Sequence, residues 1–440
     1  MQFVFSRKFY LLFGIGLLPL ALTFAVPLMP YFVLAWDVLL IAAAVFDHFA
    51  SRDLPDGLTI ERDIAARFAI GGETDVRLEI KNETPNNFFL RIKDEYPAEM
   101  KLLDKREAEI DLDARSAAEF SYRLMPTRRG SYRFGKTAVR FLSRFGLVWC
   151  QATLGEERSV KVYPNMQRAR EIELHALGAR SFLAIQRRSL RRGEGREFES
   201  MRDYVRGDEL RHISWTATAR RSRLTTRQYQ IERDQTVVIA IDAGRLMTGR
   251  IGGETKFDTA VHAALALMSA CSKGGDNCGI AVFGRRIIKF LPPKRGIEHI
   301  DSVLEALHDI EPELIEPSYA RAFQYIGSHL KKRGFIVILT DLVDTVGSRE
   351  LLTSLKLLRP RHLPLVVTIG DRDLNTTVSR KPDSIRDAFV QSAAEEIILQ
   401  REQALRHVEA MGGLALDVTT KNLGTKLLET YLRVKERGLL

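Results

Sequence analysis

Two aspartates, Asp242 and Asp341, stand where ligand chemistry is expected in an α/β protein. Asp242 follows the apolar run 236–241, and Asp341 follows the run 335–340. Such β-branched runs are typical of parallel strands buried on both faces, and ligands of open sheets bind beyond the carboxyl ends of the strands. Carboxylates there suit a hard cation, Mg²⁺ or Mn²⁺. A metal-dependent hydrolase built on Asp242 and Asp341, assisted by Asp208 or His212, is therefore one hypothesis.

The residues around these aspartates argue against a metal. The segment 242–246 reads Asp-Ala-Gly-Arg-Leu, and Arg245 would neutralise Asp242 without a cation. Ser318, Asp344 or waters would have to supply further ligands. Alternatively, Asp242 and Asp341 cap helix N-termini. We expect no bound metal or other cofactor, and no enzymatic activity, because no complete catalytic constellation is found.

A second candidate site is the basic connector, residues 186–233. It holds 13 arginines and seven acidic residues, a surplus of 13 − 7 = +6 within a whole-chain charge of +10. In a structural interpretation, Asp208 and Arg211 clamp a turn at Gly207, with Tyr204 and Trp215 packed beneath. A partner-docking surface is the second interpretation. Nucleic-acid binding, with aromatic stacking, is the third and is disfavoured because the interleaved acids repel phosphates.

This segment carries a motif of fixed residues. The motif reads E-F-x-x-x-R-x-Y-x-x-G-D-x-x-R-x-I-x-W and then an A-R pair, on Glu197, Phe198, Arg202, Tyr204, Gly207, Asp208, Arg211, Ile213, Trp215 and Arg220. It closely resembles the bacterial family catalogued as domain of unknown function 58. The resemblance implies a membrane hairpin, a β domain and a von Willebrand factor A-like domain. It also implies a MoxR-type AAA+ ATPase as partner, in assembly or maturation of other proteins.

The von Willebrand factor A family binds its cation through D-x-S-x-S after the first strand, a later threonine, and an aspartate after the fourth strand. In this chain Gly244 and Leu246 stand at the two serine positions, and the segment 316–320 lacks a clear threonine. The resemblance therefore implies a degenerate metal site in which only Asp242 and Asp341 remain.

The elements that precede these sites begin with an apolar stretch. From Phe9 to Phe46 the only charged residue is Asp37, to which we assign no role. Two membrane spans, about 9–26 and 30–46, are predicted, with a turn near the prolines at 27 and 30. Arg7 and Lys8 precede the first span, which favours a cytoplasmic N-terminus and body at the inner membrane. A cleaved signal peptide is the rival interpretation.

Three further regions follow the predicted hairpin of residues 1–50. Short alternating runs predict a β-sandwich-like domain at 57–165, and the basic connector occupies 186–233. Alternating strands and helices predict a doubly wound α/β domain, von Willebrand factor A-like, at 234–440. Three scattered cysteines, Cys150, Cys271 and Cys278, indicate neither a disulfide framework nor a zinc site.

Taken together, the residues and the resemblance predict a multidomain, membrane-anchored interaction protein. Its expected contacts are the lipid bilayer, through residues 9–46, and a protein partner that docks on the motif residues. A metal-dependent hydrolase and a nucleic-acid binder remain the alternatives.

Overall fold

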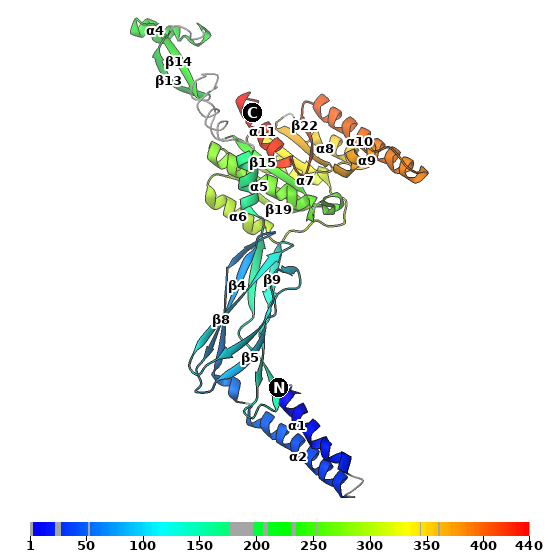
Figure 1. Cartoon of the computed structure of the whole chain (residues 1–440). Coiled ribbons are helices and arrows are strands. Elements are labelled where there is room, and N and C mark those ends of the chain that lie inside the picture. Colours follow the sequence, from blue (N-terminus) through cyan, green and yellow to red (C-terminus); the bar gives the residue numbers. More distant parts are fainter. Residues whose placement is uncertain are drawn as a thin grey trace. The chain divides into compact units, whose positions relative to one another are not determined.

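The computed structural model describes residues 3–22, 28–51, 53–175, 197–205, 210–230, 235–251, 253–343, 345–359, 361–370 and 372–439. The chain forms two compact units, Met1–Tyr163 and Pro164–Leu440. The expectation of a multidomain protein is met (Figure 1).

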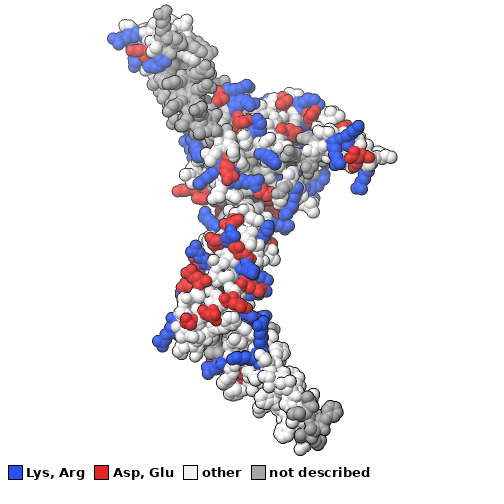
Figure 2. Space-filling model, in the orientation of Figure 1, with Lys and Arg blue, Asp and Glu red and all other residues white. Residues whose placement is uncertain are grey.

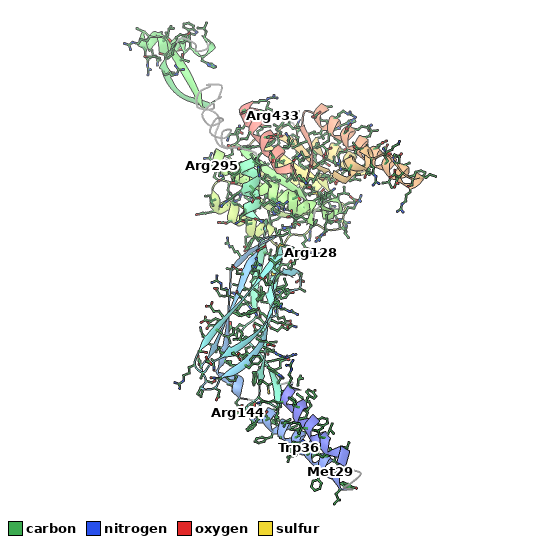
Figure 3. All side chains as sticks on the ribbon, in the orientation of Figure 1. Met29, Trp36, Arg128, Arg144, Arg295 and Arg433 are labelled. Atoms are coloured by element: carbon green, nitrogen blue, oxygen red, sulfur yellow. The ribbon has the colours of Figure 1, made fainter. Side chains whose placement is uncertain are left out.

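The first unit begins with helices α1 (Arg7–Leu17), η1 (Leu18–Leu22) and α2 (Met29–Ala50). Ser6 caps α1 by accepting a hydrogen bond from the Phe9 backbone nitrogen at 3.3 Å. The two helices pack closely because Gly16 leaves room for the Trp36 ring, whose Nε1 donates to the Leu12 carbonyl oxygen at 3.3 Å (Figure 3).

Helix α2 has the length and composition of a membrane span. Its 22 residues extend about 33 Å at 1.5 Å per residue, close to the thickness of a bilayer core. Among the described residues, α2 is the helix that is long and apolar enough to cross a membrane. Charged side chains are sparse along α1 and α2 (Figure 2). The apolar segment predicted from the sequence is thus present as an N-terminal helix, which ends at Ala50, past the predicted end at 46.

The rest of the first unit consists of short strands. One sheet has the order β1-β11-β10-β5-β7, a second β2-β4-β8-β6, and a third β3-β12-β9. The strands are β1 (Phe3–Phe5), β2 (Leu58–Ile64), β3 (Arg67–Ala69), β4 (Thr74–Asn82), β5 (Phe88–Lys93), β6 (Met100–Leu102), β7 (Glu107–Leu112), β8 (Ala117–Pro126), β9 (Gly130–Phe134), β10 (Thr137–Leu142), β11 (Val148–Leu154) and β12 (Arg158–Tyr163), and η2 (Leu54–Gly57) precedes β2. Alternate residues of β4, Val76, Leu78 and Ile80, are fully buried in the shared core, as the alternating pattern predicts.

The end of α2 is fixed to the β-strands by Asp47. This buried carboxylate accepts hydrogen bonds from the backbone nitrogens of Phe145 and Leu147, each at 3.1 Å, and from the Ser143 hydroxyl. Strand β1 adds a second connection because it pairs with β11 just before α1 begins. The N-terminal helices and the β-strands of this unit are therefore joined rigidly.

The second unit contains an open six-stranded sheet in the order β19-β18-β15-β20-β21-β22. Its strands are β15 (Thr236–Asp242), β18 (Asn277–Phe283), β19 (Ile287–Lys294), β20 (Gly334–Thr340), β21 (Leu363–Gly370) and β22 (Leu414–Thr419). All are parallel to their neighbours except β19. Strands β15, β20 and β21 are buried along nearly their whole length.

Helices cover both faces of this sheet (Figure 1). Helices α7 (Tyr319–His329), α8 (Thr345–Leu355) and α10 (Ile385–Ala410) share a core with Val238, Ala240 and Ile338 on one face. Helices α5 (Lys256–Gly274), α6 (Ile297–Leu307) and α11 (Leu423–Glu436) pack together on the other. Short elements accompany this sheet: η4 (Arg245–Thr248), β16 (Arg250–Ile251), β17 (Glu254–Thr255) and α9 (Arg372–Ser379).

Candidate functional site

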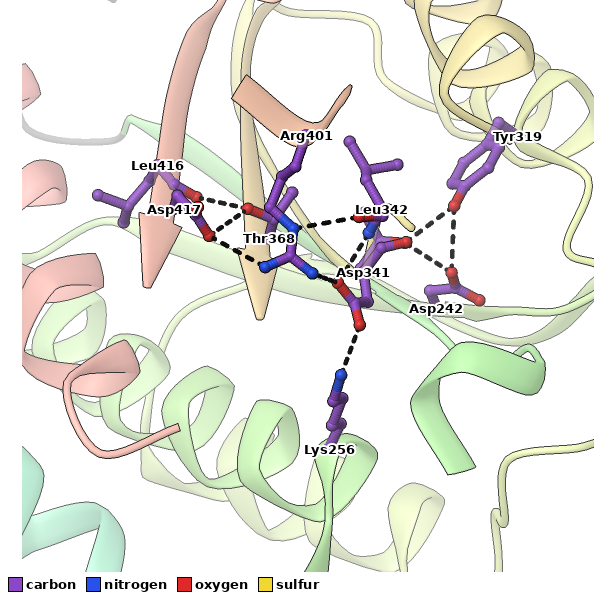
Figure 4. Close-up of polar contacts among 10 residues, drawn as sticks. Asp242, Lys256, Tyr319, Asp341, Leu342, Thr368, Arg401, Leu416 and Asp417 are labelled. Atoms are coloured by element: carbon purple, nitrogen blue, oxygen red, sulfur yellow. Dashed lines mark hydrogen bonds and ion pairs between the residues drawn. The ribbon is translucent and has the colours of Figure 1, made fainter. Parts of the chain in front are cut away.

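Asp242 ends β15 and is held by hydroxyl and backbone donors. Its Oδ2 accepts hydrogen bonds from Thr340 Oγ1 at 2.7 Å and Tyr319 Oη at 3.3 Å, and its Oδ1 accepts from the Gly244 nitrogen at 2.7 Å. The two hydroxyl oxygens also lie within hydrogen-bond distance of each other, at 2.9 Å (Figure 4). Burial raises the pKa of Asp242 to about 6, although these three hydrogen bonds act in the opposite direction.

Asp341 follows β20, and its carboxylate forms ion pairs with two basic side chains. Lys256 Nζ lies 2.5 Å from its Oδ2, and Arg401 Nη2 lies 2.8 Å from its Oδ1. The Asp341 side chain is fully buried, and those of Lys256 and Arg401 are 11% and 5% exposed. The Leu342 nitrogen adds a backbone hydrogen bond to Oδ1 at 2.8 Å.

Arg401 extends this network to the neighbouring strands. It reaches in from α10, its Nε donates to the Leu342 carbonyl oxygen at 3.1 Å, and its Nη1 lies 3.9 Å from Asp417 on β22. Asp417 also accepts a hydrogen bond from Thr368 of β21 at 2.9 Å. The network thus joins α5, α10 and three adjacent strands at the carboxyl edge of the sheet (Figure 4).

The residues present at this edge do not fit a divalent cation. Asp341 directs both oxygens at positive groups, and a cation would have to displace the Lys256 ammonium against Coulomb repulsion. The cavity between Asp242 and Asp341 has a volume of about 20 Å³, room for one water molecule. No cluster of three or more His, Cys, Asp or Glu suited to a metal occurs in the part of the chain that the structure describes.

Two predictions about these aspartates were wrong. Arg245 was expected to neutralise Asp242, but its guanidinium pairs with Glu316. The aspartate that pairs with buried cations is Asp341. The aspartates were alternatively expected to cap helices, but Gly244 is the N-cap of η4, and α8 begins only at Thr345.

Of the other candidate ligands, Ser318 is the N-cap of α7, and its backbone nitrogen donates to the Gly284 carbonyl oxygen at 2.9 Å. Asp344 lies outside the described residues. Lys256 and Arg401 were not predicted as site residues, because the sequence pattern of a helix does not distinguish a buried basic residue from an exposed one. Tyr319 and Thr340, whose hydroxyls bind Asp242, were not predicted either, although they adjoin the candidate ligands Ser318 and Asp341.

The motif residues form a separate small substructure, here called the signature arm. Strands β13 (Glu197–Asp203) and β14 (Thr225–Gln230) pair antiparallel, and between them lie η3 (Leu210–His212) and α4 (Trp215–Arg221). Glu197 and Phe198 lie opposite Gln230 and Tyr229 in the β13–β14 register. The arm was not foreseen, since residues 186–233 were treated as a connector.

Within the arm the motif residues have different surroundings. The Tyr204 nitrogen donates to the Leu224 carbonyl oxygen at 2.8 Å, and the tyrosine side chain is half-buried. Arg202 Nη1 donates to the Asp203 carbonyl oxygen at 3.2 Å, and Arg220 is exposed on α4. Arg211 lies in η3, whereas Gly207 and Asp208, and with them the proposed clamp, fall outside the described residues.

The predicted packing of Trp215 was wrong. Its side chain is 68% exposed at the first position of α4, and Val205, Leu210 and Leu224 of the arm are 61%, 70% and 47% exposed. Ile213 and Ala217 of the arm are buried instead. The arm therefore exposes large apolar side chains as well as Arg220, Arg221 and Arg223.

Comparison with solved structures gives only distant similarity. The conserved hypothetical protein BatB from Bacteroides thetaiotaomicron is 15% identical, with a TM-score of 0.31 over 46% of this chain and 99% of that one.

Sequence relatives cover more of the chain. Uncharacterized protein Mb1516 of Mycobacterium bovis is 24% identical over 56% of this chain and 82% of its own length, as is Uncharacterized protein Rv1480 of Mycobacterium tuberculosis. Uncharacterized protein YeaD of Bacillus subtilis is 23% identical over 50% of this chain and 52% of its own. Residues 200–396, which include most of the motif and most of the α/β sheet, match the family described as Protein of unknown function DUF58, which confirms the resemblance for that segment.

Proposed function

We propose that this chain is a membrane-anchored docking protein that binds a protein partner through its signature arm. The observation that carries the proposal is the exposure of Trp215, Leu210, Val205 and Leu224 on the arm, which also exposes three arginines. Exposed apolar side chains mark interaction sites, and tryptophan and arginine are enriched among hot-spot residues. The exposure of the motif residues Trp215 and Arg220 is thus explained by recognition better than by internal packing.

The carboxyl edge of the sheet supports a role that does not require a metal. In this proposal the α/β domain is a von Willebrand factor A-like domain whose cation has been replaced by the Lys256 and Arg401 side chains on Asp341. A metal-dependent hydrolase has little support, because its presumed ligand is already neutralised. The chain is therefore proposed to be a non-enzymatic adaptor.

The proposed partner is a MoxR-type AAA+ ATPase, and the proposed process is the assembly or maturation of other proteins. Both rest on the resemblance to the family. Helix α2, with α1 as a second, shorter insertion, would hold the protein at the inner membrane, with the N-terminus and the body in the cytoplasm. Arg7 and Lys8, the first two residues of α1, support this orientation.

Copurification tests the proposal directly. The intact protein is extracted in detergent, and retention of the MoxR-type ATPase from the same cell is measured for the wild type and for Trp215→Ser with Leu210→Ser. A matched control is Ile385→Ser with Phe389→Ser on α10, because these side chains are 80% and 73% exposed outside the arm. We expect the arm variant alone to lose the ATPase. No retention by the wild type, or equal retention by all three proteins, refutes the proposal.

A nucleic-acid binder is the second candidate, favoured by the exposure of Trp215 beside Arg220, Arg221 and Arg223, since bases stack on aromatic rings and phosphates attract guanidinium groups. Binding to single-stranded RNA or DNA that falls steeply with salt would support it. The absence of binding at low salt would remove it.

A further inference from the structure

A groove lies in the α/β domain, apart from the network of Asp242 and Asp341. Its volume is about 680 Å³, within the range of ligand-binding pockets. Three segments form it: the turn between β18 and β19, the loop 311–318, and the first turn of α7. The lining residues are Gly284, Arg285, Arg286, Ile287, Ile288, Glu313, Ile315 and Arg321.

Backbone hydrogen bonds fix the shape of this groove. The Gly284 nitrogen donates to the Arg286 carbonyl oxygen at 3.0 Å and closes the turn, and the Ser318 nitrogen donates to the Gly284 carbonyl oxygen at 2.9 Å. A Cβ atom at position 284 would lie 3.2 Å from Ile315 Cδ1, so the absence of a side chain there keeps the floor open. The groove is therefore preformed.

The charge of the groove is uncompensated. Arg285, Arg286 and Arg321 are exposed, and within the described residues their guanidinium groups make no ion pair. Arg245, by contrast, pairs with Glu316 of the loop. Glu313 is the single acidic residue of the lining, which leaves a surplus of 3 − 1 = +2. Such a surface attracts carboxylate or phosphate groups, which arginine binds through paired hydrogen bonds.

The apolar part of the lining distinguishes between these two kinds of ligand. Ile287, Ile288 and Ile315 are aliphatic, and the lining has no aromatic ring on which a nucleobase could stack. Branched aliphatic side chains instead suit an aliphatic side chain of a bound peptide. An acidic peptide that carries an aliphatic side chain complements both the positive charge and the apolar floor of the groove.

We propose that this arginine groove binds an acidic peptide segment of a partner protein. Its carboxylates pair with Arg285, Arg286 and Arg321, and an aliphatic side chain packs against Ile288 and Ile315. The inference deepens the proposed docking function. It rests on that function in one respect, namely that the ligand is a segment of a partner protein.

Fluorescence anisotropy tests the groove with the full chain in non-ionic detergent. The probe is a fluorescein-labelled peptide of repeated Leu-Glu-Glu, and the comparison ligands are the same peptide with Gln for Glu and a single-stranded oligothymidylate of equal length. The test variant is Arg285→Ser with Arg286→Ser. The matched control is Arg433→Ser with Arg437→Ser, because this pair removes two exposed arginines of α11 and its C-cap, with the same change in net charge.

We expect the wild type to bind the Glu peptide, the Gln peptide to bind at least about tenfold more weakly, and the groove variant to lose about tenfold in affinity while the control stays within about twofold. Equal binding of both peptides, or equal losses in both variants, overturns the proposal. Tighter, groove-dependent binding of oligothymidylate also overturns it and assigns the groove to nucleic acid. Peptide binding without retention of the ATPase would support the groove proposal and refute the proposed partner. Retention of the ATPase without peptide binding would support the proposed partner and refute the groove proposal.

Discussion

Lys256 Nζ lies 2.5 Å from Asp341 Oδ2, so an ammonium group from the first turn of α5 neutralises the carboxylate that ends β20. Thr255 and Asp258 form a capping box that fixes this turn, and Lys256 is its first helical residue. Arg401 forms a second ion pair with Asp341 from α10, on the opposite face of the sheet. The carboxyl edge of the sheet is thus closed by internal ion pairs.

Replacing Lys256 by Met should destabilise the α/β domain. The substitution leaves buried Asp341 with one cation, so we expect a loss of about 2 kcal/mol, seen as faster hydrogen exchange of the β20 amides. Lys426→Met on α11 is the control, because Lys426 pairs with Glu429 and the two side chains are 53% and 38% exposed. It should cost less than about 1 kcal/mol. Equal effects of the two substitutions would show that the Lys256–Asp341 pair is not stabilising.

Asp242 should make the stability of the domain depend on pH. Its folded-state pKa of about 6 lies above the ordinary value of 3.8, so ionisation costs stability. The cost is absent below pH 3.8 and complete above pH 6. As the pH rises from acidic to neutral, the free energy of unfolding of Asp242→Asn should therefore increase by about 1–3 kcal/mol relative to that of the wild type. Calorimetric melting across this pH range measures the gain, with exposed Asp309→Asn as control. A difference that does not vary with pH would contradict the prediction.

Divalent cations should not bind at the carboxyl edge of the sheet. Titration calorimetry of the wild type with Mg²⁺ or Mn²⁺ should give no saturable heat at millimolar concentrations, because Lys256 and Arg401 already neutralise Asp341. Binding of one ion that disappears in Asp341→Asn would establish a metal site and revive the hydrolase hypothesis.

Asp47 should hold the segment 143–147 against the end of α2. Asp47→Ala leaves the part-buried backbone nitrogens of Phe145 and Leu147 without their acceptor, at a cost of about 1–3 kcal/mol. Limited proteolysis should then cut near Arg144, whereas the exposed-site control Asp53→Ala should stay resistant. Unchanged resistance of Asp47→Ala would mean that β1 alone fixes this segment.

The strands of the α/β domain could be predicted because burial on both faces produces continuous apolar runs. The predicted runs 236–241 and 335–340 match β15 and β20 to within one residue. Helices α6 and α11 were not predicted individually, although their buried residues recur at helical spacing.

The site was less predictable than the fold because its partners are distant in sequence. Asp242 and Asp341 were identified from strand ends, but Arg401 reaches Asp341 from 60 residues away. Likewise, the alternation of acids, arginines and aromatics indicated turns in the signature arm, but exposure of Trp215 depends on how β13, β14 and α4 assemble.

The affinity of the full-length protein for the purified MoxR-type ATPase shows whether the signature arm is the docking surface. It would be measured in one Mg²⁺–ATP buffer for the wild type, for Trp215→Ser with Leu210→Ser, and for Asp242→Asn. We expect the arm variant to bind at least about tenfold more weakly, because hot-spot side chains contribute most of the binding energy, and Asp242→Asn to bind as the wild type does. Full binding by the arm variant, together with loss of binding in Asp242→Asn, would contradict this expectation.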